Sequence, residues 1–156
     1  MKLKYIIIII LLITLGALYY GLSPLFIKKV VNEQAPIPSA SEVLNTSSKA
    51  LSAKVIDTKT HPASGEVRIV KNDAGTYIRY ENFKTINGPD LFVYLANDLG
   101  AKDYTNLGEL RATEGNINYK VPAEVDVIKY KYVMVWCKQF GVLFNYADIS
   151  SIEQII

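Results

Sequence analysis

The single cysteine of the chain, Cys137, and its single histidine, His61, are the residues best suited to redox or ligand chemistry. A thiol can act as a redox group or a soft ligand, and an imidazole can bind a metal or a haem iron. Such a site needs about two to four donors, and Met134 is the one further candidate. Alternation along a strand places Met134 and Cys137 on opposite faces, so we do not expect them to share a site.

No known catalytic motif accompanies these residues. The sequence has no glycine-rich phosphate loop and no HExxH, CxxC or GxSxG pattern. A catalytic dyad or triad would have to use His61, and no spacing places it beside Cys137. The sequence therefore disfavours a hydrolase and predicts no metal site. A lone cysteine forms no internal disulfide, so cysteine usage does not report the redox compartment.

Each of these residues also has a purely structural interpretation, which the sequence leaves open. Cys137 could be a small buried apolar residue, a common role for a free cysteine. Alternatively, the neighbouring Lys138 would favour the thiolate if the thiol reaches solvent. His61 precedes a proline and reads as a loop residue. Trp136, the only tryptophan, reads as a core residue.

The element that must position Cys137 is a predicted β-hairpin over residues 127–149. Alternation gives the first strand an aromatic face that we expect in the core, formed by Ile128, Tyr130, Tyr132, Met134 and Trp136. Its other face begins with lysines and ends in Val133, Val135 and Cys137. A second apolar run, which alternates through Phe140, Val142, Phe144 and Tyr146, follows the short Lys138-Gln139 step. Two β-rich runs this close together predict a hairpin.

The preceding residues predict more short strands. Alternating runs at residues 66–70, 76–80, 91–95 and 117–121 are separated by turn signals such as Asn72-Asp73-Ala74-Gly75 and Asn87-Gly88-Pro89-Asp90. Residues 97–106 read as a polar loop. Without a convincing amphipathic helix, this pattern predicts an all-β domain over residues 55–150, a small antiparallel β-sandwich or barrel.

The N-terminal part reads as a membrane anchor followed by a linker. Residues 5–27 carry no charge and are flanked by lysines, which predicts one transmembrane helix within residues 1–29. A cleaved secretory signal is the alternative, but no small-residue cleavage pattern follows the apolar run. Residues 30–54 are rich in proline and serine and predict a flexible linker.

Charge distribution bears on localisation and partners. The N-terminal segment has slightly more positive charge before the apolar run than after it, which predicts a single-pass protein of the cell membrane with an extracytoplasmic C-terminal domain. Without the four flanking lysines, 13 basic residues face 15 acidic ones. No basic patch stands out, so we expect no nucleic-acid partner.

The order of several short motifs resembles the electron-transfer DM-thirteen domain family over residues 55–149. The motifs are His61-Pro62-Ala63-Ser64-Gly65, Asn82-Phe83, Gly88-Pro89-Asp90-Leu91, Val93-Tyr94-Leu95, Leu107-Gly108-Glu109-Leu110, Gly115, Tyr119-Lys120-Val121-Pro122, Val135-Trp136-Cys137, and Phe140, Val142, Phe144 and Ala147. The Trp-Cys pair is the sharpest of them. One departure is Asn145, where the family pattern has glycine after the phenylalanine.

The resemblance implies a small extracytoplasmic β module, of a kind found with DOMON domains that bind haem or sugars. It implies electron transfer or thiol redox chemistry through Cys137, either as a bare thiol or as a ligand of a prosthetic group. Haem is then a candidate cofactor with Cys137 as its ligand, and the redox or protein partner is unknown. His61 is a further candidate ligand on the chemistry of its side chain alone. The alternative function is a non-catalytic extracellular binding or adhesion module with a structural, buried Cys137.

Overall fold

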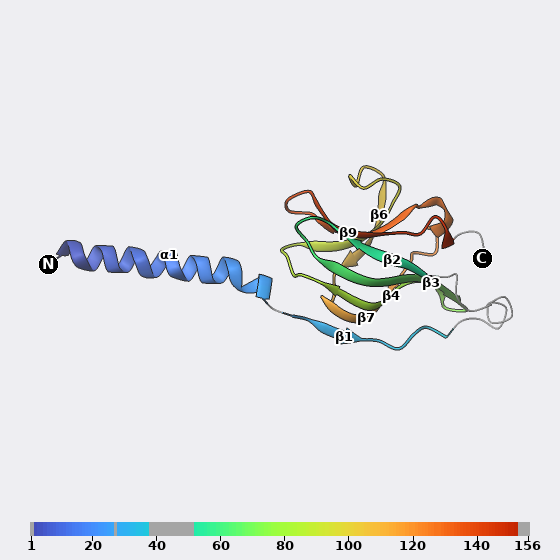
Figure 1. Ribbon diagram of the computed structural model, residues 1–156, viewed down its shortest axis with the longest axis horizontal. Helices are drawn as coiled ribbons and strands as arrows, with labels where there is room; N and C mark the ends of the chain where they lie inside the picture. Colours follow the sequence, from blue (N-terminus) through green and yellow to red (C-terminus); the bar gives the residue numbers. More distant parts are fainter. Residues whose placement is uncertain (1, 27, 38–51, 153–156) are drawn as a thin grey trace.

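The computed structural model describes residues 2–26, 28–37 and 52–152, and within the first helix it describes the side chains of residues 3–19. Helix α1 (Lys2–Phe26) extends away from a β domain (Figure 1). Nine strands in the described part form one sheet: β1 (Val30–Asn32), β2 (Ser52–Asp57), β3 (Ala63–Asn72), β4 (Gly75–Thr85), β5 (Leu91–Ala96), β6 (Tyr104–Glu109), β7 (Glu114–Lys120), β8 (Tyr132–Cys137) and β9 (Val142–Asp148).

The sheet is curled into an open half-barrel whose strand order is β1-β7-β4-β3-β2-β9-β8-β5-β6. Strand β2 makes the corner, because its first half pairs with β3 and its second half pairs with β9. All pairs are antiparallel except β1 with β7. The prediction of a mostly β, mostly antiparallel domain is confirmed. The sandwich or closed barrel is replaced by one sheet whose two halves face each other across a shared core.

The main core fills the inside of the half-barrel. Its fully buried members come from both halves of the sheet and include Val67, Ile78, Phe83, Leu95, Ile117, Val133 and Val135. A second, smaller cluster lies on the outer face of the β5–β8–β9 half and centres on Tyr94, Ala96 and Met134. The inner cluster contains many fully buried side chains, so it supplies most of the hydrophobic stabilisation.

The predicted hairpin is present, but its core-facing side is reversed. Strands β8 and β9 pair in antiparallel register, and Met134 and Cys137 do lie on opposite faces. The main core takes Val133, Val135 and Cys137, whereas Trp136 and Tyr132 lie half-buried on the outer face. Both faces of β8 are apolar, so alternation separated the two sets correctly within this strand without telling which one faces the larger core. Before β8, Tyr130 packs against the main core as predicted, whereas Ile128 is exposed.

Three element boundaries differ from the sequence prediction. Residues 127–129 form a short 3-10 helix, capped by the Asp126 side chain, instead of the beginning of β8. The turn of the hairpin is longer than expected and includes the exposed Phe140. Strand β6 occupies part of the predicted polar loop. As an edge strand it has no fully buried residue, so its sequence shows little hydrophobic alternation.

The residues on both sides of the predicted linker belong to the sheet. Strand β1 pairs with β7, and β2 begins before residue 55, so the β domain is larger than predicted. Glu33 holds the first segment in place, since its carboxylate pairs with Arg111 at 2.7 Å and accepts the amide of Asn118. Gly115 permits the close approach of β1, because a Cβ there would overlap the carbonyl of Val31. Residues 38–51, the middle of the predicted linker, lie outside the described residues.

The N-terminal residues form a helix, as the apolar run predicted. Its described side chains are exposed, and among them are the isoleucines and leucines of residues 6–13. Nevertheless, no helix in the described part of the chain is long and apolar enough to cross a membrane. The predicted transmembrane span is therefore not supported by the structure.

Candidate functional site

Cys137 ends strand β8 inside the main core. Its side chain is 1% exposed, and no other cysteine is present in the chain. The thiol Sγ–H donates to the carbonyl oxygen of Pro89 at 3.1 Å. The same loop is held to the end of β8 a second time, since the amide of Lys138 donates to the carbonyl of Asp90 at 3.0 Å. In this structure the thiol is thus covered by the loop that leads into β5.

The loop over Cys137, residues 87–90, has a tight backbone. Asp90 has φ of 56°, in the left-handed region that few residues other than glycine adopt readily. Gly88 lies directly against the ring of Phe144, because a Cβ at this position would be 2.6 Å from Phe144 Cζ. The absence of a side chain at Gly88 therefore allows the loop to close over Cys137 while Phe144 stays packed.

His61 also contacts the Phe144 ring. The two rings stack with centroids 3.9 Å apart and an angle of 18° between their planes. The hydroxyl of Thr58 fixes this arrangement, because Oγ1 is 2.9 Å from His61 Nδ1 and donates to the carbonyl of Phe144 at 3.0 Å. Partial burial lowers the pKa of His61 below its ordinary value, which favours the neutral imidazole.

These contacts connect the two residues singled out from the sequence. His61 stacks on Phe144, Phe144 packs on Gly88, and the next residue of that loop accepts the hydrogen bond of Cys137. We call His61, Phe144, residues 87–90 and Cys137 the cysteine cluster. His61 and Cys137 are members of one cluster, but Phe144 and the loop lie between them, so no direct contact is formed that could make a catalytic dyad.

The surroundings of Cys137 and His61 do not fit a haem or a bound metal ion. The thiol is engaged with Pro89 and packed among apolar side chains, and neither residue lines the pocket at Lys84 or the pocket at Val127. Among those residues, no three His, Cys, Asp or Glu side chains gather in a way that could hold a metal. We therefore derive no step through a prosthetic group.

Sequence reasoning did not identify Asn145 as a member of this region. It is fully buried on β9, next to Phe144, and its Nδ2 donates to Thr85 Oγ1 at 3.1 Å. Its Oδ1 is also buried and has no hydrogen-bond partner among the described residues. An unpaired buried acceptor costs about 1–3 kcal/mol, so stability alone does not account for this side chain.

Asn145 lies in strand β9, directly after the extra residue Phe144 that shifts the register between β8 and β9. It pairs with Val135 on one side and Asp57 on the other, and its φ is not positive. A glycine is therefore not required by the backbone here. The departure from the family pattern places a polar side chain in the core, and Asn145 still pairs with both neighbouring strands.

Comparison with known families gives a match. Residues 55–149, more than half of the chain, match the family model described as Electron transfer DM13. The chain belongs to this family. The family resemblance predicted from the motif order is thereby confirmed, with the same residue range. No curated protein and no solved structure gives a significant match to the chain.

The matched range covers the DM13 domain from the middle of β2 to the residue after β9. It contains every residue of the cysteine cluster. Strand β1 and the first residues of β2 lie outside it, although the structure pairs them with the DM13 strands. A redox-related role for the DM13 domain follows from the family, and the roles of individual residues are proposals.

Proposed function

We propose that this DM13 domain takes part in electron transfer or thiol redox chemistry, with Cys137 as its redox group. The observation that carries the proposal is the cysteine cluster itself. The only thiol of the chain lies under a loop with a strained residue, and that loop packs through Phe144 onto His61, which is partly exposed. The cluster thus connects a buried thiol with the surface of the domain.

A buried thiol reacts when the segment covering it opens. Three contacts hold the loop of residues 87–90 against the thiol and its neighbours, namely the thiol hydrogen bond, the Lys138–Asp90 bond and the packing of Gly88 on the Phe144 ring. Local opening of such a loop costs less than unfolding of the domain. In thiol–disulfide exchange, the Cys137 thiolate would attack a disulfide of a partner protein, form a mixed disulfide and release the partner's other sulfur as a thiolate.

The rate of reaction with a thiol reagent tests this function in the full chain. Gly88→Ala puts a methyl group into the Phe144 ring, so we expect the loop to shift and Cys137 to react at least about tenfold faster than in the unmodified protein. Gly100→Ala is the matched control on another loop, where the added Cβ meets only side-chain atoms, namely Asp98 Oδ1 at 3.1 Å and Lys102 Cε at 4.0 Å. Its rate should equal that of the unmodified protein.

A thiol that reacts only at the rate of global unfolding in both variants would rule out a redox role for Cys137. The same result would support the second candidate function, a non-catalytic binding or adhesion module with a structural cysteine. One observation favours that alternative: Cys137 is almost fully buried, and its thiol already has a hydrogen-bond acceptor. A Cys137→Ser variant that keeps its partner binding would then be expected.

We further propose that the protein is held at the cell membrane by its N-terminal segment, with the DM13 domain on the extracytoplasmic side. The uncharged run of residues 5–27 supports this, because a run of this length is long enough to span a bilayer as a helix. The exposed isoleucines of α1 also need an apolar environment.

Carbonate extraction of membranes tests the anchoring, and protease treatment of intact cells tests the side on which the domain lies. Release of the full-length chain by carbonate, or complete protection of the domain, would contradict them.

A further inference from the structure

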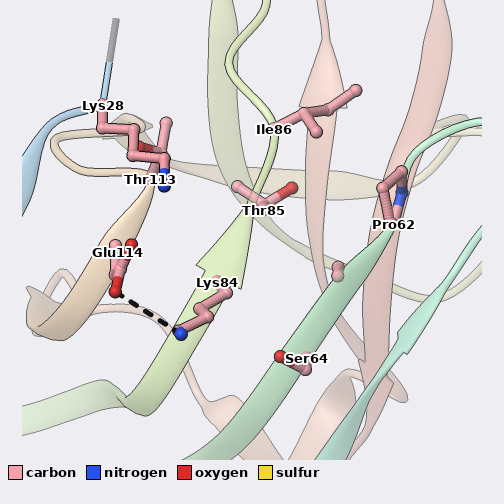
Figure 2. A pocket seen from close by; sticks show the side chains of 9 residues that line it. Lys28, Pro62, Ser64, Lys84, Thr85, Ile86, Thr113 and Glu114 are labelled. Atoms are coloured by element: carbon pink, nitrogen blue, oxygen red, sulfur yellow. Dashed lines mark ion pairs between the residues drawn. The ribbon is translucent and has the colours of Figure 1, made fainter. Parts of the chain in front are cut away.

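A pocket of about 310 Å³ opens where the chain leaves α1 and meets the ends of three strands (Figure 2). Polar groups line it from four segments, namely Lys28 after α1, Ser64 of β3, Lys84 and Thr85 of β4, and Glu114 of β7. Cys137 and His61 are not among its lining residues. The pocket is therefore separate from the cysteine cluster, although Pro62 at its edge directly follows His61.

Lys28 is held at this pocket by the backbone of its neighbour. The carbonyl of Lys29 accepts hydrogen bonds from the amides of Thr113 and Glu114, at 2.9 Å and 3.1 Å. The amide of Lys29 donates to Thr113 Oγ1 at 3.1 Å, and Thr113 is itself only 4% exposed. The Lys28 side chain extends from this fixed point over Thr113, as Figure 2 shows. The backbone hydrogen bonds of Lys29 therefore fix the point from which the Lys28 side chain extends.

The pocket offers more hydrogen-bond donors than acceptors. Lys28 and the hydroxyl of Ser64 have no partner among the described residues. The Thr85 oxygen accepts from the buried Asn145 amide, which leaves the Thr85 hydroxyl proton available to a ligand. Glu114 is the only carboxylate in the lining, and it is already paired with Lys84 at 3.6 Å.

The charges of the lining favour an anion. Two lysines and one glutamate leave a net charge of +1 (2 − 1). The Lys84–Glu114 pair is partly exposed and therefore weak, so Lys84 can turn to a ligand at little cost. Ammonium groups and hydroxyls that line one pocket suit a ligand with several acceptor oxygens, and a phosphate group has this chemistry.

We propose that this pocket binds a phosphate group, either that of a lipid head group or free phosphate. The pocket lies two residues beyond the end of α1, whose described side chains are largely apolar and exposed. A lipid whose acyl chains lie along α1 would place its phosphate at this level. The proposal is independent of the redox role, because none of its residues belongs to the cysteine cluster.

Binding can be measured on the full chain in dodecyl maltoside micelles, which contain no phosphate. In one arm inorganic phosphate is added at constant ionic strength, with chloride as the reference. In the other arm the micelles receive phosphatidic acid, with diacylglycerol as the control that lacks a head-group phosphate. We expect saturable shifts of the amide signals of Ser64, Thr85 and Glu114 in at least one arm. A response to phosphatidic acid alone identifies the lipid, and an equal response in both arms identifies phosphate itself.

Three substitutions test whether the charges of the pocket determine the affinity for phosphate. Lys28→Gln should weaken it about fivefold, as expected for one exposed charge pair. Glu114→Gln should strengthen it, because the competing carboxylate is gone. Lys102→Gln, on the loop before β6, should leave it unchanged. None of the three residues is buried, so the variants should fold. The proposal is overturned if neither arm saturates, if Lys28→Gln has no effect, or if Glu114→Gln weakens binding, which would mark a cationic ligand.

Discussion

The two faces of the β5–β8–β9 half of the sheet have different surroundings. The inner face presents Leu95, Val133, Val135 and Cys137 to the second half of the half-barrel, and all are 1% exposed or less. The outer face carries Trp136, Phe92 and Leu143, which cover Met134 and Tyr94 but remain half-buried themselves. Side chains of similar apolar character therefore contribute differently to the stability of the fold. One face is enclosed by the other half of the sheet, and the other face is covered only by neighbouring side chains of the same face.

Because of this difference, the two faces are suited to different roles. The enclosed face holds the thiol, which is buried under the loop of residues 87–90. The outer face carries large aromatic rings that are partly buried and partly open to solvent, so they can both stabilise the sheet and make surface contacts. Lys138 Nζ lies 5.4 Å from the centroid of the Phe92 ring on this face. Four predictions test the contrast, in order of decreasing effect.

The largest effect is expected for Leu95→Ala on the inner face. Leu95 is fully buried in the main core, so its removal leaves a cavity, and the free energy of unfolding should fall by about 2–5 kcal/mol. Denaturant unfolding of the full chain measures this loss. The matched variant is Leu143→Ala on the outer face, which should cost about 1 kcal/mol because the side chain is half-buried. Equal losses at the two positions would contradict the difference between the faces.

Trp136→Ala should have an intermediate effect. The sequence placed Trp136 in the core and predicted the loss of a fully buried indole, but the structure leaves this ring half-buried on the outer face. The expected loss in free energy of unfolding is therefore about 2 kcal/mol, half of what a fully buried aromatic would give. Tryptophan fluorescence provides the check, since a half-exposed indole should be accessible to a small quencher. A loss above about 4 kcal/mol would show that the outer face is covered.

Cys137→Ser should cost less, about 1 kcal/mol. A hydroxyl can replace the thiol as donor to Pro89, so the buried oxygen is not left unpaired. The thermal midpoint of the purified variant measures this change. Cys137→Ala, which removes the donor, serves as the comparison and should cost at least as much. A serine variant destabilised by more than about 3 kcal/mol would mean that the hydroxyl does not reach the loop carbonyl.

The smallest effect is a pH dependence due to His61. Burial lowers the pKa of His61 in the folded protein below the value of 6.5. As the pH falls below about 6.5, the unfolded chain takes up a proton that the folded chain resists, so stability should decrease through this range. At higher pH both states are neutral and the effect vanishes. His61→Gln should remove this part of the slope between pH 7 and 5. An unchanged slope would show that other groups cause it.

Several features of the domain followed from the sequence alone. Alternating runs bounded by turn residues predicted β3, β4, β5, β7 and the β8–β9 hairpin, because each run needs only its own neighbours to establish a two-residue period. The same rule placed Met134 and Cys137 on opposite faces. The order of short motifs identified the family, and it pointed to Cys137 without showing whether the thiol is exposed.

Tertiary structure decided the rest. Which face of β8 became the core depended on the layer packed against it, since both faces are apolar in sequence. Strand β1 depends on pairing with β7, which is far away in the chain, and β6 depends on pairing with its neighbour β5 at the edge of the sheet. Neither strand has a strong pattern of its own. The stack of His61 on Phe144 and the bond from Asn145 to Thr85 join residues far apart in the chain. Local periodicity contains no information on such contacts, because they exist only after the sheet has curled and brought its two halves together.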